Sequence, residues 1–584
     1  MTIPTDATAS VPYALPRLGS ALRAAIRDGY SWITFRADIT AGITVGIVAL
    51  PLSMALAIAS GMPPQSGIYT AIVAGVLIAA LGGSRTQVTG PTAAFIAILA
   101  PVAARFGPSG LLMATAMAGV FLIAFGCARL GRLIEYIPYP VTTGFTAGIA
   151  VVVAVGQLPA LFGISPDTGP HTLERLAGAI VNLPHTRWPD VAVGLVTLVI
   201  LVAWPRVSHR IPAPPLALVL GTLLAITMNA MLAPDAVATI RSTFTYAVDG
   251  ISRPGIPATL PAFILPWQGL GPAGTSSALS FDTVRLLLPS SLAIAVLGAM
   301  ESLLSAVVAD GIAGTKHDPD AELVAQGIGN MVVPFFGGFA ATGAIARTAV
   351  NTRAGAKSPI AAITHSAFIL VATVAVAPWL SYLPMAALAG MLLFIAWNMA
   401  EAKHALRVVK IAPRSDALVL ITCFGFTIIF DMVVAVVTGV MLASLLFMRR
   451  LAEISGARIV GESHPALTRP VPVGTVVYEV AGPLFFGAAH KAMSSLHVVA
   501  DETRNVILDL SGVPIIDATG LVNLQSALDR LANDARTVYL AGVQAQPRDV
   551  LKRAGLDEAA GFVEFTDTLT DALDRIEGST DQGR

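Results

Sequence analysis

Long apolar runs recur along most of the chain, from Ile39 to Phe447. The hydrocarbon core of a bilayer is about 30 Å thick, so a helix that crosses it needs roughly 20 apolar residues. The pattern predicts fourteen segments, several of them too short to cross alone. They are 39–61, 66–82, 91–106, 109–128, 141–161, 189–204, 213–232, 284–308, 321–336, 344–356, 359–377, 385–400, 416–430 and 432–449. We therefore expect an α-helical polytopic membrane protein.

The pattern changes after Arg450, where short β runs alternate with amphipathic helical stretches. The runs at 476–480, 506–510 and 538–541 are each followed by a helix-like stretch, which indicates a small cytoplasmic α/β domain. The predicted organisation is a cytoplasmic N-terminal segment 1–38, a transmembrane domain 39–450, a linker 451–472, the α/β domain 473–575 and a C-terminal tail 576–584.

Composition and charge support this division. With 55% hydrophobic and 12% charged residues, the chain differs from soluble globular enzymes, in which about 25% of residues are charged. Its high hydrophobicity and balanced charge, 36 basic against 36 acidic residues, also exclude a disordered chain. Up to Arg450 there are 25 basic and 18 acidic residues, and after it 11 and 18. The net charge therefore differs in sign between the two parts, which indicates that they have different surroundings.

The basic residues also predict an orientation. Clusters such as Arg206/Arg210 and Arg449/Arg450 follow even-numbered segments, as expected from the positive-inside rule if both termini are cytoplasmic. Because the clusters adjoin apolar runs, we expect no nucleic-acid partner. The first 38 residues lack a short apolar run before a small-residue cleavage site, so no cleaved signal peptide is predicted. The expected location is the cell inner (plasma) membrane.

Several kinds of chemistry are not predicted. No Gly-Lys dipeptide occurs, so the phosphate-binding loop of an ATP-driven pump is missing and the energy for transport must come from gradients. Two cysteines and nine histidines show no ligand spacing, so we predict neither a metal nor a cofactor.

Two Gly-rich segments, 82–94 and 336–348, interrupt the apolar pattern. Pro91 suits the first turn of a helix, so the first segment predicts a half-helix that begins near the bilayer middle. The segments fall at the third position of each set of seven, which indicates inverted repeats whose half-helix N-termini share a site. Facing helix dipoles favour an anion there. The alternative is that the glycines and prolines kink helices for packing.

Two ionisable residues lie inside predicted spans, where a charge costs roughly 2.5–3.5 kcal/mol on insertion scales. Glu301 is interpreted as a carboxylate that couples transport to protons or another cation, with a buried structural hydrogen bond as the alternative. Arg347 is interpreted as a counter-charge for the substrate, or as an anchor of its helix toward the inner surface.

Several stretches together are similar to those of one transporter family. They are DITAG at 38–42, ALP at 49–51, GMPPQSGIY at 61–69, GSR at 83–85, TGPT at 89–92, AQGIGN at 325–330 and TGAIART at 342–348. On these residues the chain resembles the sulfate permease (SulP) or solute carrier 26 family of anion transporters. The resemblance implies two inverted seven-helix repeats divided into core and gate domains, a cytoplasmic STAS domain, and usually a homodimer.

The resemblance also implies a binding site between the third and tenth helices. The corresponding residues are Leu52, Leu56, Thr89, Gly90, Thr92, Ala93, Gly343, Ala344, Ala346 and Arg347. Some relatives have a glutamine and an aromatic residue where this chain has Leu52 and Leu56, and an aromatic residue at Thr92. Because of these departures, the resemblance does not identify the anion.

For coupling, Glu301 matches the eighth-helix acid of proton-coupled relatives. Relatives that couple to other cations use an aspartate and a hydroxyl one turn on, a position held here by Ser305. Glutamate favours protons, and sodium stays an alternative.

The C-terminal part resembles STAS domains in ILDLSGV at 507–513 and IDATG at 516–520. In anti-sigma factor antagonists of this fold, a phosphorylated hydroxyl occupies the position of Thr519. The prediction for Thr519 is therefore either regulatory phosphorylation or a hydroxyl that caps a helix.

These observations predict a membrane transporter rather than an enzyme. We expect secondary active transport of a small anion by alternating access, coupled to protons, with a sulfate-like inorganic anion favoured over bicarbonate or a dicarboxylate. The alternative is a passive anion channel or a membrane signalling protein whose STAS domain is the working part.

Overall fold

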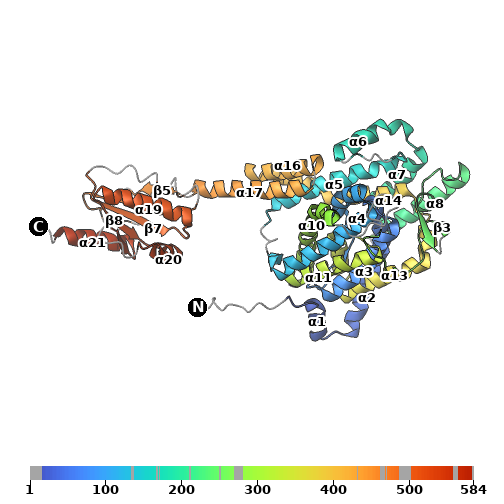
Figure 1. The fold of residues 1–584 in the computed structure, drawn as a ribbon, viewed down its shortest axis with the longest axis horizontal. Coiled ribbons are helices and arrows are strands. Elements are labelled where there is room, and N and C mark those ends of the chain that lie inside the picture. The colour runs from blue at the N-terminus through green and yellow to red at the C-terminus, as the bar shows by residue number, and fades with distance from the viewer. Residues whose placement is uncertain are drawn as a thin grey trace. The chain divides into compact units, whose positions relative to one another are not determined.

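The computed structural model describes residues 16–132, 137–165, 169, 171–208, 212–248, 251–268, 281–430, 432–454, 456–460, 467, 470–485, 489, 493, 502–556 and 563–581. The chain forms two compact units, Met1–Val440 and Met441–Arg584 (Figure 1). We describe each unit by itself.

The first unit is almost entirely helical. Its helices are α1 (Ser20–Arg27), α2 (Trp32–Ala59), α3 (Pro64–Leu81), α4 (Ala93–Cys127), α5 (Tyr139–Phe162), α6 (Thr172–Val181), η2 (Leu183–His185), α7 (Trp188–Val207), α8 (Ala213–Met231), α9 (Ile240–Thr243), α10 (Phe281–Ala313), α11 (Pro319–Val332), η3 (Val333–Phe336), α12 (Ile345–Arg353), α13 (Ile360–Leu380), α14 (Met385–Ala400), α15 (Ala402–Ile411), α16 (Arg414–Ile429) and α17 (Met432–Ile454), which continues into the second unit. Its strands are β1 (Thr89–Gly90), β2 (Thr245–Val248), β3 (Ile251–Pro254) and β4 (Thr342–Gly343).

Proline begins many of these helices. It occupies the first turn of α3, α5, α7, α8 and α11, where its missing N–H costs no hydrogen bond. Helix α4 is two helices joined at a kink, where Gly107 has φ 71° and Pro108 follows. Each of the fourteen predicted segments overlaps a helix, and ten helices among the described residues are long and apolar enough to cross a membrane. The predicted helical polytopic fold is confirmed.

The membrane helices pack in two sets. We call α2, α3, α4, α10, α11, α12 and α13 the core group, because these helices pack mainly on one another. We call α5, α7, α8, α14 and α16 the gate group. In it, α5 packs against α14, α7 and α16, and α14 also packs against α7 and α8. Each group takes helices from both halves of the chain, as two inverted repeats require.

The second unit contains a five-stranded sheet in the order β5 (Gly456–Ile459), β6 (Thr475–Ala481), β7 (Asn505–Gly512), β8 (Thr537–Ala541) and β9 (Val563–Thr566). β5 is antiparallel to β6, and the other neighbours are parallel. Among its described residues, the unit also contains helices α19 (Ala518–Asn533), α20 (Ala545–Arg553) and α21 (Leu569–Asp581). β5 lies within the predicted linker, and α21 extends beyond the predicted end of the α/β domain at residue 575.

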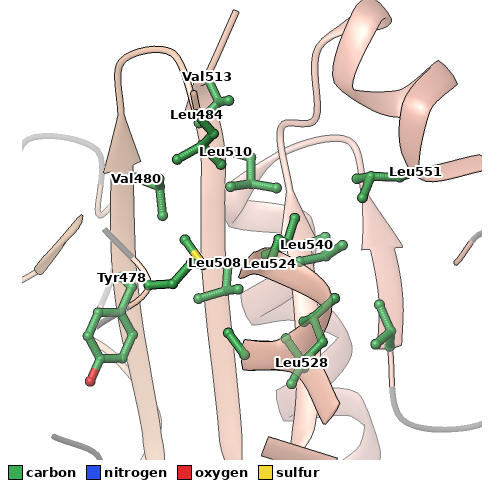
Figure 2. Packing of buried hydrophobic residues seen from close by; sticks show 14 of the residues in the cluster. Tyr478, Val480, Leu484, Leu508, Leu510, Val513, Leu524, Leu528, Leu540 and Leu551 are labelled. Atoms are coloured by element: carbon green, nitrogen blue, oxygen red, sulfur yellow. The ribbon is translucent and has the colours of Figure 1, made fainter. Parts of the chain in front are cut away.

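Both faces of this sheet are buried. Successive side chains of a strand point to opposite faces, so each strand contributes to two apolar clusters. Tyr478 and Leu508 pack on one face with Leu524 and Leu528 of α19, as Figure 2 shows. Their neighbours Val477 and Ile507 pack on the other face with Leu573 and Ile576 of α21. The apolar runs predicted as strands therefore lie in the middle of an α/β domain.

Candidate functional site

The two Gly-rich interruptions meet each other. β1 and β4 form a two-residue antiparallel ladder in which Thr89 pairs with Gly343 and Gly90 pairs with Thr342. The Ala344 N–H adds a 2.8 Å hydrogen bond to the Val88 carbonyl. Inside a membrane, non-helical backbone needs such partners because lipid supplies none. The ladder therefore holds two extended segments together and satisfies part of their backbone.

A helix begins directly after each strand. α4 follows Thr92 and α12 follows Ala344, and neither of these cap residues accepts a hydrogen bond on its side chain from the helix. The first N–H groups of a helix have no partner within it and attract anions. The ladder thus brings together two helix N-termini, which is the arrangement that the sequence predicted.

Two glycines of the ladder, Gly90 and Gly343, are closely approached by side chains. A Cβ on Gly90 would lie 2.8 Å from Nη1 of Arg347. A Cβ on Gly343 would collide with Nε2 of Gln87 and lie 2.9 Å from Cβ of Ser305. The neighbouring side chains thus fill the space that a larger residue would need.

Arg347 lies behind the start of α4. Its side chain is buried, with 5% exposed, and Nη2 donates a hydrogen bond to the Pro91 carbonyl. Within the described residues, Nη1 has no hydrogen-bond partner. This placement argues against the alternative that Arg347 anchors α12 toward the inner surface. It puts a positive charge beside the N-terminus of α4.

The polar residues of α12 attach it to the segment before α4. The Val88 N–H donates to Thr348 Oγ1 over 3.0 Å, and Asn351 Nδ2 donates to the Thr86 carbonyl over 2.8 Å. The sequence reasoning missed these contacts, although Thr348 and Asn351 stand one turn apart in a nine-residue helix, a spacing that indicates a shared polar face.

Glu301 reaches the same junction from α10. Its half-buried carboxylate accepts a 3.1 Å hydrogen bond from the hydroxyl of Thr92, the residue before α4. Ser305, one turn further on, lies with its hydroxyl 2.9 Å from that of Thr348. The structure therefore brings Glu301 to the candidate anion site and places the Ser305 hydroxyl against α12.

The remaining predicted site residues differ in exposure. Ala93 and Ala344 are buried at the two helix starts, whereas Ala346 is exposed. Leu52 is half-buried and Leu56 is buried on α2, which packs against both α4 and α12.

A second polar network was not predicted. On α11, Glu322 Oε2 accepts from the N–H groups of Gly83 and Ser84 over 2.9 and 3.3 Å. Gln326 Nε2 donates to Glu322 Oε1 over 3.0 Å and to Thr89 Oγ1 over 3.3 Å. The spacing of 322 and 326 is the signal that was available, because residues four apart share a helix face. The network supports the backbone that leads into β1.

Thr519 is the second residue of α19. The helix is capped by Asp517, whose carboxylate accepts a 2.7 Å hydrogen bond from the Gly520 N–H. The prediction that the Thr519 hydroxyl caps this helix is therefore wrong, because the aspartate two residues earlier fills that role. No group of three or more His, Cys, Asp or Glu side chains suited to a metal ion occurs among the described residues.

Comparisons with known proteins agree along nearly the whole chain. The model of the sulfate permease family matches residues 35–423, and that of the STAS domain matches residues 466–572. The chain is 37% identical to the putative sulfate transporter YvdB of Bacillus subtilis, over 92% of this chain and 97% of that one. It is 29% identical to the bicarbonate transporter BicA of Picosynechococcus, over 89% and 91%.

Two solved structures are also similar. Murine solute carrier 26 family member A9, an anion transporter in the inward-facing state, aligns with a TM-score of 0.82 at 17% identity, over 96% of this chain and 94% of that one. At this identity the likeness concerns the fold alone. The transmembrane domain of a cyanobacterial BicA aligns with a TM-score of 0.59 at 27% identity, over 71% and 98%.

Proposed function

The chain belongs to the sulfate permease family, and we propose that it is a secondary active transporter that moves sulfate across the membrane together with protons. Family members are transporters of anions such as sulfate or bicarbonate and not enzymes. Sulfate is proposed first because the 37% identical relative is a putative sulfate transporter. Bicarbonate is the second candidate because the 29% identical BicA transports it.

The observation that carries the proposal is the β1–β4 ladder with a helix N-terminus after each strand. We propose that the anion binds the N–H groups at Thr92–Ala93 and Ile345–Ala346, with the buried charge of Arg347 behind them and α2 residues Leu52 and Leu56 beside them. The Ala344 N–H is already bonded to the Val88 carbonyl, so Ala344 contributes only its position at the start of α12. Helix N-termini and a guanidinium all favour negative charge. Backbone N–H groups read charge and size, which suits a small inorganic anion.

Coupling follows from the contact between Thr92 and Glu301. An ionised Glu301 places a negative charge one hydrogen bond from the anion site, where like charges repel strongly at low dielectric. Protonation removes that charge, so an anion and a proton bind together. Ser305, the residue expected for a sodium site, shares its hydroxyl with Thr348 instead, which supports protons over sodium.

Alternating access follows from the two packing groups. The core group carries the whole candidate site, including β1, β4, Glu301 and Arg347, whereas the gate group contributes none of these residues. We propose that the core group moves against the gate group and exposes the site to each side in turn. The protein is proposed to lie in the inner (plasma) membrane as a homodimer with both termini cytoplasmic, and the STAS domain to regulate it, with Thr519 as its phosphorylation site.

The test is uptake of radioactive sulfate by proteoliposomes with an imposed proton gradient, acidic outside. We expect accumulation above equilibrium that a protonophore abolishes. Glu301→Gln should retain sulfate exchange at equal pH but lose accumulation driven by the gradient. The control is Glu453→Gln, the same change at an exposed carboxylate of α17.

Four results would contradict parts of this proposal. Flux that only equilibrates, and ignores the protonophore, would identify a passive channel. Accumulation retained by Glu301→Gln would place coupling elsewhere, and accumulation driven by a sodium gradient would favour the Ser305 alternative. Failure to accumulate radioactive sulfate, together with accumulation of radioactive bicarbonate under the same gradient, would replace sulfate by bicarbonate as the substrate.

A further inference from the structure

Helix α15 presents a row of cations. Lys403, Arg407 and Lys410 stand four and three residues apart, so they share one face of the helix, and all three are exposed. The opposite side carries Ala405, Val408 and Val409, which are half-buried. α15 packs against α5 and α16. The helix is therefore amphipathic, with its basic face directed away from the protein.

The helices before and after α15 indicate that it lies at the membrane surface. It follows the membrane-spanning α14 after a single residue, Glu401, whose left-handed backbone (φ 40°) turns the chain. Two residues after α15, the apolar α16 begins at Arg414. A short helix tied to two membrane helices at both ends lies near the point where those helices leave the hydrocarbon.

Exposed apolar side chains flank the basic row. Leu406 is 60% exposed and Ile411 is 76% exposed. Trp397, one turn before the end of α14, is 74% exposed, and tryptophan is typical of the membrane–water interface. A surface that combines these side chains with cations matches a lipid layer, whose headgroups are charged and whose interior is apolar.

We propose that the basic face of α15 binds the headgroups of anionic phospholipids, of the phosphatidylglycerol class. A basic cluster on an amphipathic helix at a membrane is attracted by such headgroups, and three charges favour them over zwitterionic lipid by on the order of a hundredfold. The neighbouring carboxylates are Glu401 before the helix and Asp416 in the first turn of α16, so cations predominate along the row.

The bound lipid is connected to the gate group. His404 of α15 shares a hydrogen bond with the Tyr139 hydroxyl at the start of α5, and the two rings meet edge to face at 5.8 Å. This contact sets the rotation of α15 so that Lys403 and Arg407 face outward. Lipid held by these residues therefore contacts an element that is fastened to α5.

The C-terminal unit is a competing occupant, since its excess of acidic residues could also cover a basic face. The exposed Leu406, Ile411 and Trp397 favour lipid, because apolar side chains beside the cations gain nothing from an acidic, water-exposed protein surface. The experiment below separates the two occupants.

The test uses the full chain in nanodiscs that contain a photoactivatable phosphatidylglycerol or the matching phosphatidylcholine. Label on peptides covering residues 401–414 is quantified by mass spectrometry. At low salt we expect phosphatidylglycerol to label this segment at least about tenfold more than phosphatidylcholine, and the excess to shrink as salt rises. Lys403→Gln/Arg407→Gln/Lys410→Gln should label equally with both lipids.

Two controls define the effect. Lys403→Arg/Arg407→Lys/Lys410→Arg keeps the charge and should keep the preference. Arg530→Gln/Arg548→Gln/Arg553→Gln loses the same charge in the C-terminal unit and should also keep it.

Equal labelling of the wild-type chain by both lipids would overturn the proposal, and this comparison stands even if the glutamine variant fails to fold. A preference that survives in the folded glutamine variant would also overturn it. Carbodiimide cross-links from Lys403 or Lys410 to the C-terminal unit, without excess phosphatidylglycerol label, would show that the acidic unit covers this face instead.

Discussion

The core group and the gate group differ in how their polar side chains find hydrogen-bond partners. In the core group, polar side chains form hydrogen bonds with the backbone of another segment. Glu322 accepts one from the Gly83 N–H, and Asn351 donates one to the Thr86 carbonyl. In the gate group, threonine hydroxyls donate to carbonyls of their own helix. Thr146 bonds the Thr142 carbonyl, Thr197 that of Val193, Thr222 that of Leu218 and Thr427 that of Cys423.

The difference arises from backbone continuity. The gate helices satisfy their own N–H and C=O groups, so the hydroxyls of these four threonines need no distant partner. The core group contains two extended segments whose backbone groups must be satisfied from outside, and Glu322, Thr348 and Asn351 do this. Buried side chains that bond the backbone of the two extended segments therefore mark the part of the molecule that holds the candidate site.

The largest effect is expected from Glu322→Ala. The N–H groups of Gly83 and Ser84 would lose a buried acceptor, at roughly 1–3 kcal/mol each, so the free energy of unfolding should fall by about 3 kcal/mol. The matched change in the gate group is Thr427→Val, whose hydroxyl bonds its own helix and whose loss should cost under about 1 kcal/mol. Thermal unfolding in one detergent compares them, and equal destabilisation would remove the distinction between the groups.

Next in size is a side chain added to the ladder. Gly343→Ala should weaken anion binding by more than about tenfold, since overpacking typically costs about 1–3 kcal/mol and the collision with Gln87 lies at the site. Gly343→Val should abolish uptake. Gln87→Ala in the Gly343→Ala background should restore part of the affinity, because it removes one of the two colliding groups.

Gly425→Ala is the control, since a Cβ there meets nothing within 4 Å. Calorimetric titration of the anion measures each variant, with size exclusion to check folding. Normal affinity in folded Gly343→Ala would exclude the ladder from the site.

Thr92→Val should act more mildly. It removes the hydroxyl that donates to Glu301, which is worth about 1 kcal/mol and hence about fivefold in the coupling between anion and proton. The anion affinity should then depend less on pH than in the wild type. Thr146→Val, which loses a hydroxyl bonded within a gate helix, should not change that dependence. An unchanged pH dependence in Thr92→Val would separate Glu301 from the anion.

The smallest effect is expected from removing the C-terminal unit. Because β5 begins at Gly456 and pairs with β6, the cut belongs before it rather than near Val473. A chain that ends at Glu453 keeps both half-helices and Glu301, so anion affinity should stay within about twofold while transport rate or dimer stability changes. If the folded truncation binds no anion, the C-terminal unit completes the site.

The sequence supported much of this fold because its signals are local. Apolar runs located the membrane helices, and the Gly-rich segment around Pro91 located the first half-helix. The expected place of Pro91 in the first turn was wrong, because α4 begins two residues later, at Ala93. Short β runs that alternate with helix-like stretches indicated the strands of the C-terminal unit. Each of these features depends on neighbouring residues, which a single chain displays directly.

The contacts that assemble the site could not be predicted in the same way. Thr92 and Glu301 are 209 positions apart, and Arg347 and Pro91 are 256 apart. The sequence of one segment does not indicate which distant residue it contacts. The polar face of α12 and the pair Glu322 and Gln326 were visible as spacings, but their partners are backbone groups of another segment, and backbone groups leave no residue-specific signal.

The central claim is that the anion binds where α4 and α12 begin. The most direct measurement is anomalous diffraction from crystals grown with selenate in place of sulfate. We predict a selenium peak that places the selenate oxygens within hydrogen-bonding distance of N–H groups at Thr92–Ala93 and Ile345–Ala346. A peak elsewhere in the molecule, or none at selenate concentrations that inhibit sulfate uptake, would contradict the account.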